Sequence, residues 1–202
     1  MPDWCRNHPS EMIAYADGEG KGDHEESGAP LRASAASIPY REEVDRVFAA
    51  LAEYLKDKPW RKRLIAIRPC WGIYGEWHTF GMGNCPDVSE PMVKAFRRYA
   101  DGKYAGANPP TPAERTSGGV ILDPVANRKA IDYFNCMQLE VVGLMHSMAR
   151  SVKRHLPGQT DLEKFAFALR SDRKRHRKSQ LYARIEALGV PRGNPGADEI
   201  PR

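Results

Sequence analysis

One short stretch of the sequence has the pattern of a buried strand, and a loop rich in glycine and aromatic residues follows it directly. The strand is predicted over 64–68, within "RLIAIR", where apolar residues run without alternation. Such a run is typical of a strand covered on both faces in a parallel sheet. The loop, "CWGIYGEWHTFG" at 70–81, carries Glu76 between Tyr74 and Trp77. Because functional loops of α/β proteins follow the C-terminal ends of strands, we expect a site here.

Helical patterns lie on both sides of this strand. Apolar residues recur at helical spacing in three segments, 41–57, 87–104 and 123–155. The first has its acidic residues near the start, where they favour the helix dipole. The second opens with Ser89 as the expected N-cap and Pro91 in the first turn. The third is the longest, and "LPG" at 156–158 is expected to end it.

The remaining sequence predicts loops and a tail of different character. Residues 1–40 and 105–119 are rich in glycine, proline or charge and are expected to be mostly loop. The predicted order of elements is a helix, a strand, a long loop and further helices. This order indicates an α/β fold class that is rich in helix and has few strands. We therefore divide the chain into a folded segment, 1–158, and a basic tail, 159–202, expected to be helical over about 161–188 and then disordered.

The positive charge of the chain is concentrated towards that tail. The formal net charge of the 202 residues is +5. From Arg150 onward 13 Lys and Arg face 6 Asp and Glu, so the whole positive excess belongs to this part. The run "SDRKRHRKSQ" makes nucleic-acid binding one alternative function, because clustered Lys and Arg neutralise phosphates. No helix-turn-helix, RRM or zinc-finger signature accompanies the run, and such runs are usually solvated faces.

Other classes of protein are disfavoured by what the sequence lacks. No run of about 18 apolar residues is present, so no membrane partner is expected. The first residues show no basic region followed by an apolar one, so no signal peptide is predicted and the cytoplasm is the expected compartment. The four cysteines and six histidines have no metal-ligand spacing, which predicts neither a metal site nor a disulfide framework. No cofactor is implied.

Glu76 has the surroundings of a general acid. A carboxylate among Trp71, Tyr74 and Trp77 is partly desolvated, which disfavours its charged form and raises its pKa. A glutamate tuned upward in this way can donate a proton near neutral pH. The aromatic rings offer flat apolar surfaces with polar edges, which suit the C–H face of a sugar. The alternative is that the tryptophans are core residues and that Glu76 pairs with an arginine.

Several segments resemble retaining glycoside hydrolases with a TIM-barrel catalytic domain. "WGIYGEWHTF" followed by "PDVSEPMVKAFRRYADGKY" is similar to the fourth-strand region of the β-galactosidases of family forty-two and their relatives, in which a G-E-W-like segment precedes a helix. "NHPSEMIAYADG" looks like the loop after the third strand. "PTPAERTSGG" and "DPVANRKAIDYFN" look like the segment leading into the fourth helix. The similarity covers residues 3–158.

The resemblance implies retaining hydrolysis of β-galactosides or related glycans, with Glu76 as the general acid/base. The residues that it places on the sugar-binding face are Trp71, Tyr74, Trp77 and His78. The usual pattern of this clan has an asparagine before the glutamate, where this chain has Gly75. That asparagine binds the sugar's 2-hydroxyl, and His78 or Asn84 is the candidate to replace it.

By the same resemblance the chain covers part of a (β/α)₈ TIM barrel, from just after strand three through helix four. A complete barrel takes about 250 residues, and retaining hydrolysis needs a second carboxyl group about 5–5.5 Å from the first. In this clan the second carboxyl follows the seventh strand, which has no counterpart in the sequence. A non-catalytic carbohydrate-binding remnant is therefore a further alternative. Self-association is also expected, because such a segment exposes apolar faces.

Overall fold

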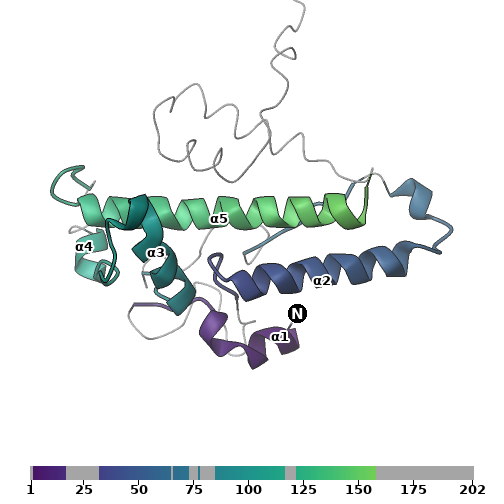
Figure 1. The fold of residues 1–202 in the computed structure, drawn as a ribbon, viewed down its shortest axis with the longest axis horizontal. Coiled ribbons are helices and arrows are strands. Elements are labelled where there is room, and N and C mark those ends of the chain that lie inside the picture. The colour runs from purple at the N-terminus through teal and green to yellow at the C-terminus, as the bar shows by residue number, and fades with distance from the viewer. Residues whose placement is uncertain are drawn as a thin grey trace, which may run out of the picture. The chain divides into compact units, whose positions relative to one another are not determined.

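The computed structural model describes residues 2–16, 32–64, 66–72, 77, 85–116 and 122–157, which form a helix-rich fold (Figure 1). Its helices are α1 (Pro2–Asn7), η1 (Pro9–Glu11), α2 (Ile38–Leu55), η2 (Arg61–Arg63), α3 (Glu90–Gly102), α4 (Pro112–Thr116) and α5 (Arg128–His155). Within these ranges the chain forms isolated β-bridges but no strand. The described residues belong to one unit, Met1–Asp161, and the expected tail at 159–202 lies outside them.

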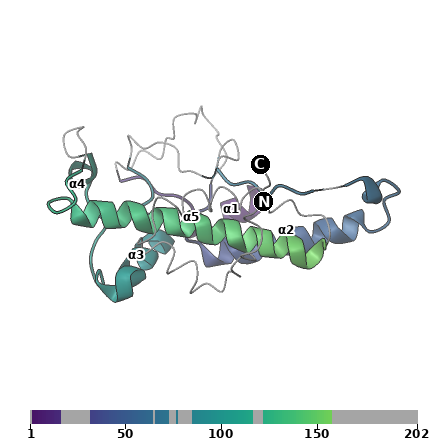
Figure 2. The same ribbon diagram turned by 90° about the horizontal axis from the view of Figure 1, so that it is seen from above.

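Helices α2 and α5 run alongside each other and form the main helix pair (Figure 1 and Figure 2). At one end of the pair Leu55 of α2 packs against Val152 of α5 and against Leu156, and all three side chains are buried. Leu64 and Ile67, which follow α2 in the chain, pack on this cluster. Burial of such side chains stabilises a fold by about 1.5–3 kcal/mol each, so this apolar cluster helps to fix the pair.

Helix α3 packs on the first half of α5 through an aromatic cluster. The ring of Phe96 in α3 stacks on Tyr104 with 4.4 Å between centroids. The same ring meets Tyr133 of α5 edge-on at 4.7 Å. Phe96 and Tyr133 are completely buried. Stacked and edge-on aromatic pairs add about 0.5–1.5 kcal/mol each beyond the area that they bury, which makes this cluster the centre of the α3–α5 contact.

The helix predicted over 41–57 is present as α2, but it begins earlier. Ser37 is the N-cap: its hydroxyl oxygen accepts from the backbone N–H of Tyr40 at 3.0 Å and donates to Glu11 Oε2 at 2.6 Å. Pro39 occupies the first turn, where a missing N–H costs nothing. Because α2 starts at Ile38, its first turn contains no acidic residue. The prediction that acidic residues stand at the start of this helix is therefore wrong.

The helix predicted over 87–104 is α3, and Ser89 is its N-cap with Pro91 in the first turn, as expected. The Ser89 hydroxyl, however, makes no capping hydrogen bond. The carboxylate of Asp87 instead accepts the Ser89 N–H at 2.9 Å.

The helix predicted over 123–155 is α5, which starts only at Arg128. The Asp123 carboxylate accepts the N–H groups of Val125 and Ala126, at 2.8 and 2.6 Å, and these bonds hold the preceding residues in a turn. The helix ends at His155, as "LPG" predicted.

Two expectations of loop are wrong in part. The segment 1–40 contains α1 and η1, and its residues 38–40 already belong to α2. The segment 105–119 contains α4. These short helices have too few turns to show an apolar period, which is why the sequence pattern did not predict them.

The strand predicted over 64–68 is not formed at residues 64 and 66–68, and Ile65 lies outside the described residues. A buried strand needs a neighbouring strand to satisfy its N–H and C=O groups. Within the described ranges no such neighbour is present, and the apolar side chains of Leu64 and Ile67 are used against α2 and α5 instead. None of the helices that the structure describes has the length and apolar character needed to cross a membrane.

Candidate functional site

A short backbone ladder of three chain segments holds the region around the predicted site. Residues 11–16 lie in the middle and pair with 32–34 on one side and with 85–88 on the other. The hydrogen bonds run from Ile13 N to Arg32 O (2.8 Å), Ser34 N to Glu11 O (2.9 Å), Val88 N to Ala14 O (2.8 Å) and Ala16 N to Cys85 O (3.3 Å). We call this arrangement the ladder; it joins three parts of the chain that are distant in sequence.

Trp71 ties the start of the predicted loop to the ladder. Its indole Nε1–H donates to the carbonyl oxygen of Ala33 at 3.2 Å, and its side chain is buried. The carbonyl of Trp71 in turn accepts the backbone N–H of Trp77 at 3.2 Å. This bond closes the segment 71–77, which carries Glu76 in the sequence.

The backbone of this closed segment has unusual dihedral angles. Trp77 has a φ of 59° and Gly72 a φ of 88°. Glycine adopts positive φ at no steric cost, whereas a large residue such as tryptophan rarely does. Trp77 is nevertheless buried, with 9% of its surface exposed. A large residue keeps a positive φ only where its packing and hydrogen bonds enforce that conformation. Residues of this kind cluster at functional sites.

The chain that follows the predicted loop pairs with the ladder at Cys85, and Asp87 contacts the ladder through its side chain. Asp87 is 4% exposed, and its Oδ1 accepts the N–H groups of Ala14 (3.3 Å) and Ser89 (2.9 Å). Burial raises the pKa of Asp87, and hydrogen bonds from Ser34, Ser89 and the backbone oppose that rise.

A buried arginine lies against this end of the ladder. Arg115 of α4 is 5% exposed, its Nη1 donates to the carbonyl of Pro86, and its guanidinium carbon lies 4.6 Å from the ring centroid of Tyr133. Burial lowers the pKa of Arg115, while the nearby Tyr133, Cys85 and Asp87 oppose the change. The burial of Arg115 could not be predicted from the sequence, because a charged residue in a proline-rich stretch is expected to be exposed.

The structure brings together two of the predicted site residues, Trp71 and Trp77. The other predicted residues, Glu76, Tyr74, His78 and Asn84, lie outside the described residues. In the part of the chain that is described, no three His, Cys, Asp or Glu side chains are grouped so that they could hold a metal ion. The ladder, Asp87 and Arg115 are the features that sequence reasoning missed, since they depend on contacts between distant segments.

Comparison with known proteins gave no relative: no protein-family model, no curated protein and no solved structure matches this chain.

Proposed function

We propose that this chain carries the general-acid part of a retaining glycoside hydrolase site, with Glu76 as the acid/base. The observation that carries the proposal is the closed segment 71–77, whose ends meet through the Trp77 N–H and the Trp71 carbonyl at 3.2 Å. Both ends of the surrounding loop are fixed on the ladder, through Trp71 and through Cys85. A loop held in this way supports a carboxylate at a defined position, which proton transfer to a leaving group requires.

The tryptophans have a specific part in this proposal. Trp71 and Trp77 each expose less than a tenth of their surface. In the proposed site these two rings shield one side of Glu76 from water. A carboxyl group beside apolar rings favours its protonated form, which is the form that donates a proton. Tyr74 and His78 are the candidates to contact the sugar itself.

The proposed fold of the active protein is a TIM barrel, of which this chain supplies a segment. In that arrangement 64–68 becomes a strand when neighbouring strands pair with it, and α2 and α5 belong to the outer layer of helices. Retaining hydrolysis needs a nucleophilic carboxyl group about 5–5.5 Å from Glu76. Cleavage of a β-galactoside or a related glycan therefore requires this second carboxyl group as well as Glu76.

A test of the proposal compares sugar binding with sugar cleavage in the full chain. Binding of methyl β-galactoside is followed by saturation-transfer NMR, and turnover is followed with nitrophenyl β-galactoside. We expect the unmodified chain to bind the galactoside, and Glu76→Gln to bind it without any turnover. Glu90→Gln is the matched control, because Glu90 is an exposed glutamate on α3 whose neighbour is Lys94 at 2.5 Å.

The possible results separate the alternatives. Turnover that is lost in Glu76→Gln and kept in Glu90→Gln supports the hydrolase. Binding by all three proteins without turnover supports a non-catalytic carbohydrate-binding protein. Failure of the unmodified chain to bind any galactoside in this experiment contradicts both.

A further inference from the structure

One end of the α2–α5 pair is strongly basic. The segment 53–68 covers the last residues of α2, the short helix η2 and the residues that follow it. This segment contains six Lys and Arg against two Asp and Glu. The other residues up to 149 contain 12 Lys and Arg against 18 Asp and Glu, so the positive charge of the chain before its tail is concentrated at this end.

Packing and backbone hydrogen bonds fix this basic segment on the helix pair. Leu64 and Ile67 pack against the buried cluster of Leu55, Val152 and Leu156, which joins α2 to α5. Between the end of α2 and Leu64, four successive backbone hydrogen bonds of 2.8–3.1 Å turn the chain. Figure 1 and Figure 2 show η2 as the short blue helix that follows α2. The side chains of η2 are therefore presented from a fixed backbone.

Trp60 and Arg63 lie on the same side of η2. Trp60 is the N-cap of this helix, and its carbonyl oxygen accepts the backbone N–H of Arg63 at 2.8 Å. A 3₁₀-helix has three residues per turn, so residues three apart lie one above the other. The Trp60 side chain is 44% exposed, and Arg63 is exposed as well. An exposed indole and an exposed guanidinium therefore share one face of η2.

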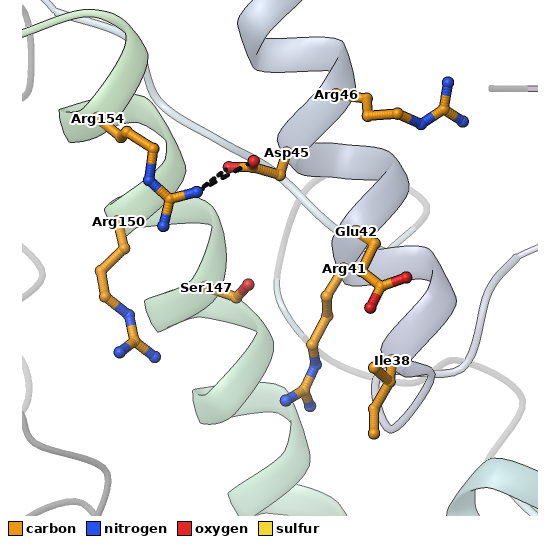
Figure 3. A pocket seen from close by; sticks show the side chains of 8 residues that line it. All are labelled: Ile38, Arg41, Glu42, Asp45, Arg46, Ser147, Arg150 and Arg154. Carbon is orange, nitrogen blue, oxygen red and sulfur yellow. Dashed lines mark hydrogen bonds and ion pairs between the residues drawn. The ribbon is translucent and has the colours of Figure 1, made fainter.

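The two exposed cations of η2 are available to a ligand. Within the part of the chain that the structure describes, neither Lys62 nor Arg63 forms an ion pair. Arg154, in the last turn of α5, differs from them in this respect. It donates to both carboxylate oxygens of Asp45 in α2, at 3.0 and 3.1 Å, as the dashed line in Figure 3 marks. An anionic ligand at this end of the pair therefore meets its free cations on η2.

We propose that this face of η2 binds single-stranded nucleic acid, with a base stacked on Trp60 and the adjacent phosphates bound by Lys62 and Arg63. Proteins that bind single strands combine exposed aromatic rings with a positively charged surface that follows the backbone. Guanidinium groups also bind phosphate oxygens by charge-assisted hydrogen bonds. In a duplex the faces of the bases are stacked on one another, so an exposed indole suits a single strand.

An anionic membrane is the competing partner for a tryptophan among cations. A helix that binds at a membrane surface places a whole apolar face among the lipids. The apolar side chains that follow Trp60, those of Leu64 and Ile67, pack against α2 and α5 instead. Nucleic acid is therefore the partner that this surface fits better. The surface is distinct from the basic run at 171–180, and it is independent of the proposed hydrolase, in which η2 takes no part.

The test measures binding of the full chain to fluorescein-labelled oligothymidylate and oligouridylate of about twelve nucleotides, by fluorescence anisotropy at several salt concentrations. Trp60→Ala should weaken binding about tenfold, because the stacking of a base on the ring is lost. It should leave the slope of log affinity against log salt unchanged, because no phosphate contact is removed. Trp60→Phe keeps an aromatic ring and should bind within about threefold of the original protein.

A double replacement tests the phosphate contacts. Lys62→Gln with Arg63→Gln should make the salt slope shallower by about 1.4, since each phosphate contact of a single strand contributes about 0.7. The letters "RKR" occur both at 61–63 and at 173–175, so Lys174→Gln with Arg175→Gln is the matched control for the same loss of charge. The control should leave the affinity within about twofold and the slope unchanged.

The possible results are distinct. Saturable binding that falls in Trp60→Ala and in the η2 double variant supports the proposal, and the tighter of the two oligonucleotides identifies DNA or RNA. Absence of saturable binding by both oligonucleotides would falsify it. Full affinity in Trp60→Ala, or an equal or larger loss in the 174–175 control, would also overturn it, since charge attraction alone would then explain the binding. Binding to phosphatidylserine vesicles without binding to either oligonucleotide would assign this surface to a membrane instead.

Discussion

The backbone N–H of Trp77 donates to the carbonyl oxygen of Trp71 across 3.2 Å, and the side chains of both residues are buried. The indole of Trp71 at the same time donates to the carbonyl of Ala33, in a segment 38 residues earlier in the chain. One residue thus closes the segment that carries Glu76 and anchors it to the ladder. The geometry of the candidate site therefore depends on Trp71 more than on any other described residue.

Replacement of Trp71 by phenylalanine should destabilise the protein by about 2 kcal/mol. Phenylalanine keeps an aromatic ring but lacks the indole N–H, so the buried carbonyl of Ala33 loses its donor. Urea unfolding measures the change in the free energy of unfolding. Trp60→Phe is the control, because the Trp60 side chain is 44% exposed and its loss should alter stability by less than about 0.5 kcal/mol. Equal effects of the two substitutions would show that the Trp71–Ala33 bond contributes nothing.

The sequence predicted the long helices well, because their signals are local. The apolar period of 41–57, 87–104 and 123–155 led to α2, α3 and α5, and Pro91 marked the first turn of α3 correctly. Local signals also misled at the boundaries. The carboxylate of Asp123 stabilises a turn where the pattern predicted a helix, since a short acidic side chain competes for backbone N–H groups.

The contacts that position the candidate site could not be predicted, because they join distant segments. Nothing near Trp71 in the sequence indicates that its indole N–H binds Ala33. Nothing in "PAERT" indicates that Arg115 is buried against Tyr133. The predicted strand at 64–68 failed for a related reason: apolar composition predicts burial, but pairing requires a partner strand that composition does not supply.

Replacement of Ser37 by alanine should destabilise the protein by about 1–2 kcal/mol. The Ser37 hydroxyl caps α2 by accepting from the Tyr40 N–H at 3.0 Å, and it donates to Glu11 at 2.6 Å. Both contacts are lost in alanine, and the residue is completely buried, so water cannot replace them. Ser37→Thr keeps the hydroxyl and is the second variant to measure by thermal or urea unfolding. An alanine variant as stable as the original protein would contradict the assigned N-cap.

Replacement of Gly143 by alanine should stabilise the protein by less than helix propensity alone predicts. Alanine in place of glycine stabilises a helix interior by about 1 kcal/mol. The new Cβ would, however, lie 3.3 Å from the Arg41 guanidinium, which would have to shift by a few tenths of an ångström while bound to Ala35 and Glu140. We expect a net gain in the free energy of unfolding of less than about 1 kcal/mol, measured by urea unfolding. Asn135→Ala, at an exposed position of α5, is the control for helix propensity alone. A full gain of about 1 kcal/mol would show that Arg41 is not held against Gly143.

Asp132 gives the chain a defined dependence of stability on pH. It is 1% exposed and accepts hydrogen bonds from Tyr104 Oη (2.6 Å), Arg128 Nε (2.9 Å) and Lys103 Nζ (3.1 Å). Burial raises the pKa of Asp132, but the hydrogen bonds from these three donors outweigh burial, and the pKa is lowered from its ordinary value of 3.8. A carboxyl group whose pKa is lower in the folded than in the unfolded chain stabilises the fold above the unfolded pKa, and this contribution is lost as the pH falls towards the folded pKa.

Replacement of Asp132 by asparagine should therefore cost about 2 kcal/mol at neutral pH and progressively less below pH 3.8. The amide is uncharged and presents hydrogen-bond donors to a site that already contains three. Urea unfolding at several pH values measures the difference between variant and original protein. Asp87→Asn is the comparison variant, because the pKa of Asp87 is raised by burial rather than lowered. Ionisation of Asp87 therefore decreases the free energy of unfolding as the pH rises. The stability of Asp87→Asn should not show this decrease. A difference between Asp132→Asn and the original protein that stays constant from pH 7 to about pH 2 would show that the charge of Asp132 does not stabilise the contact between α5 and the residues that follow α3.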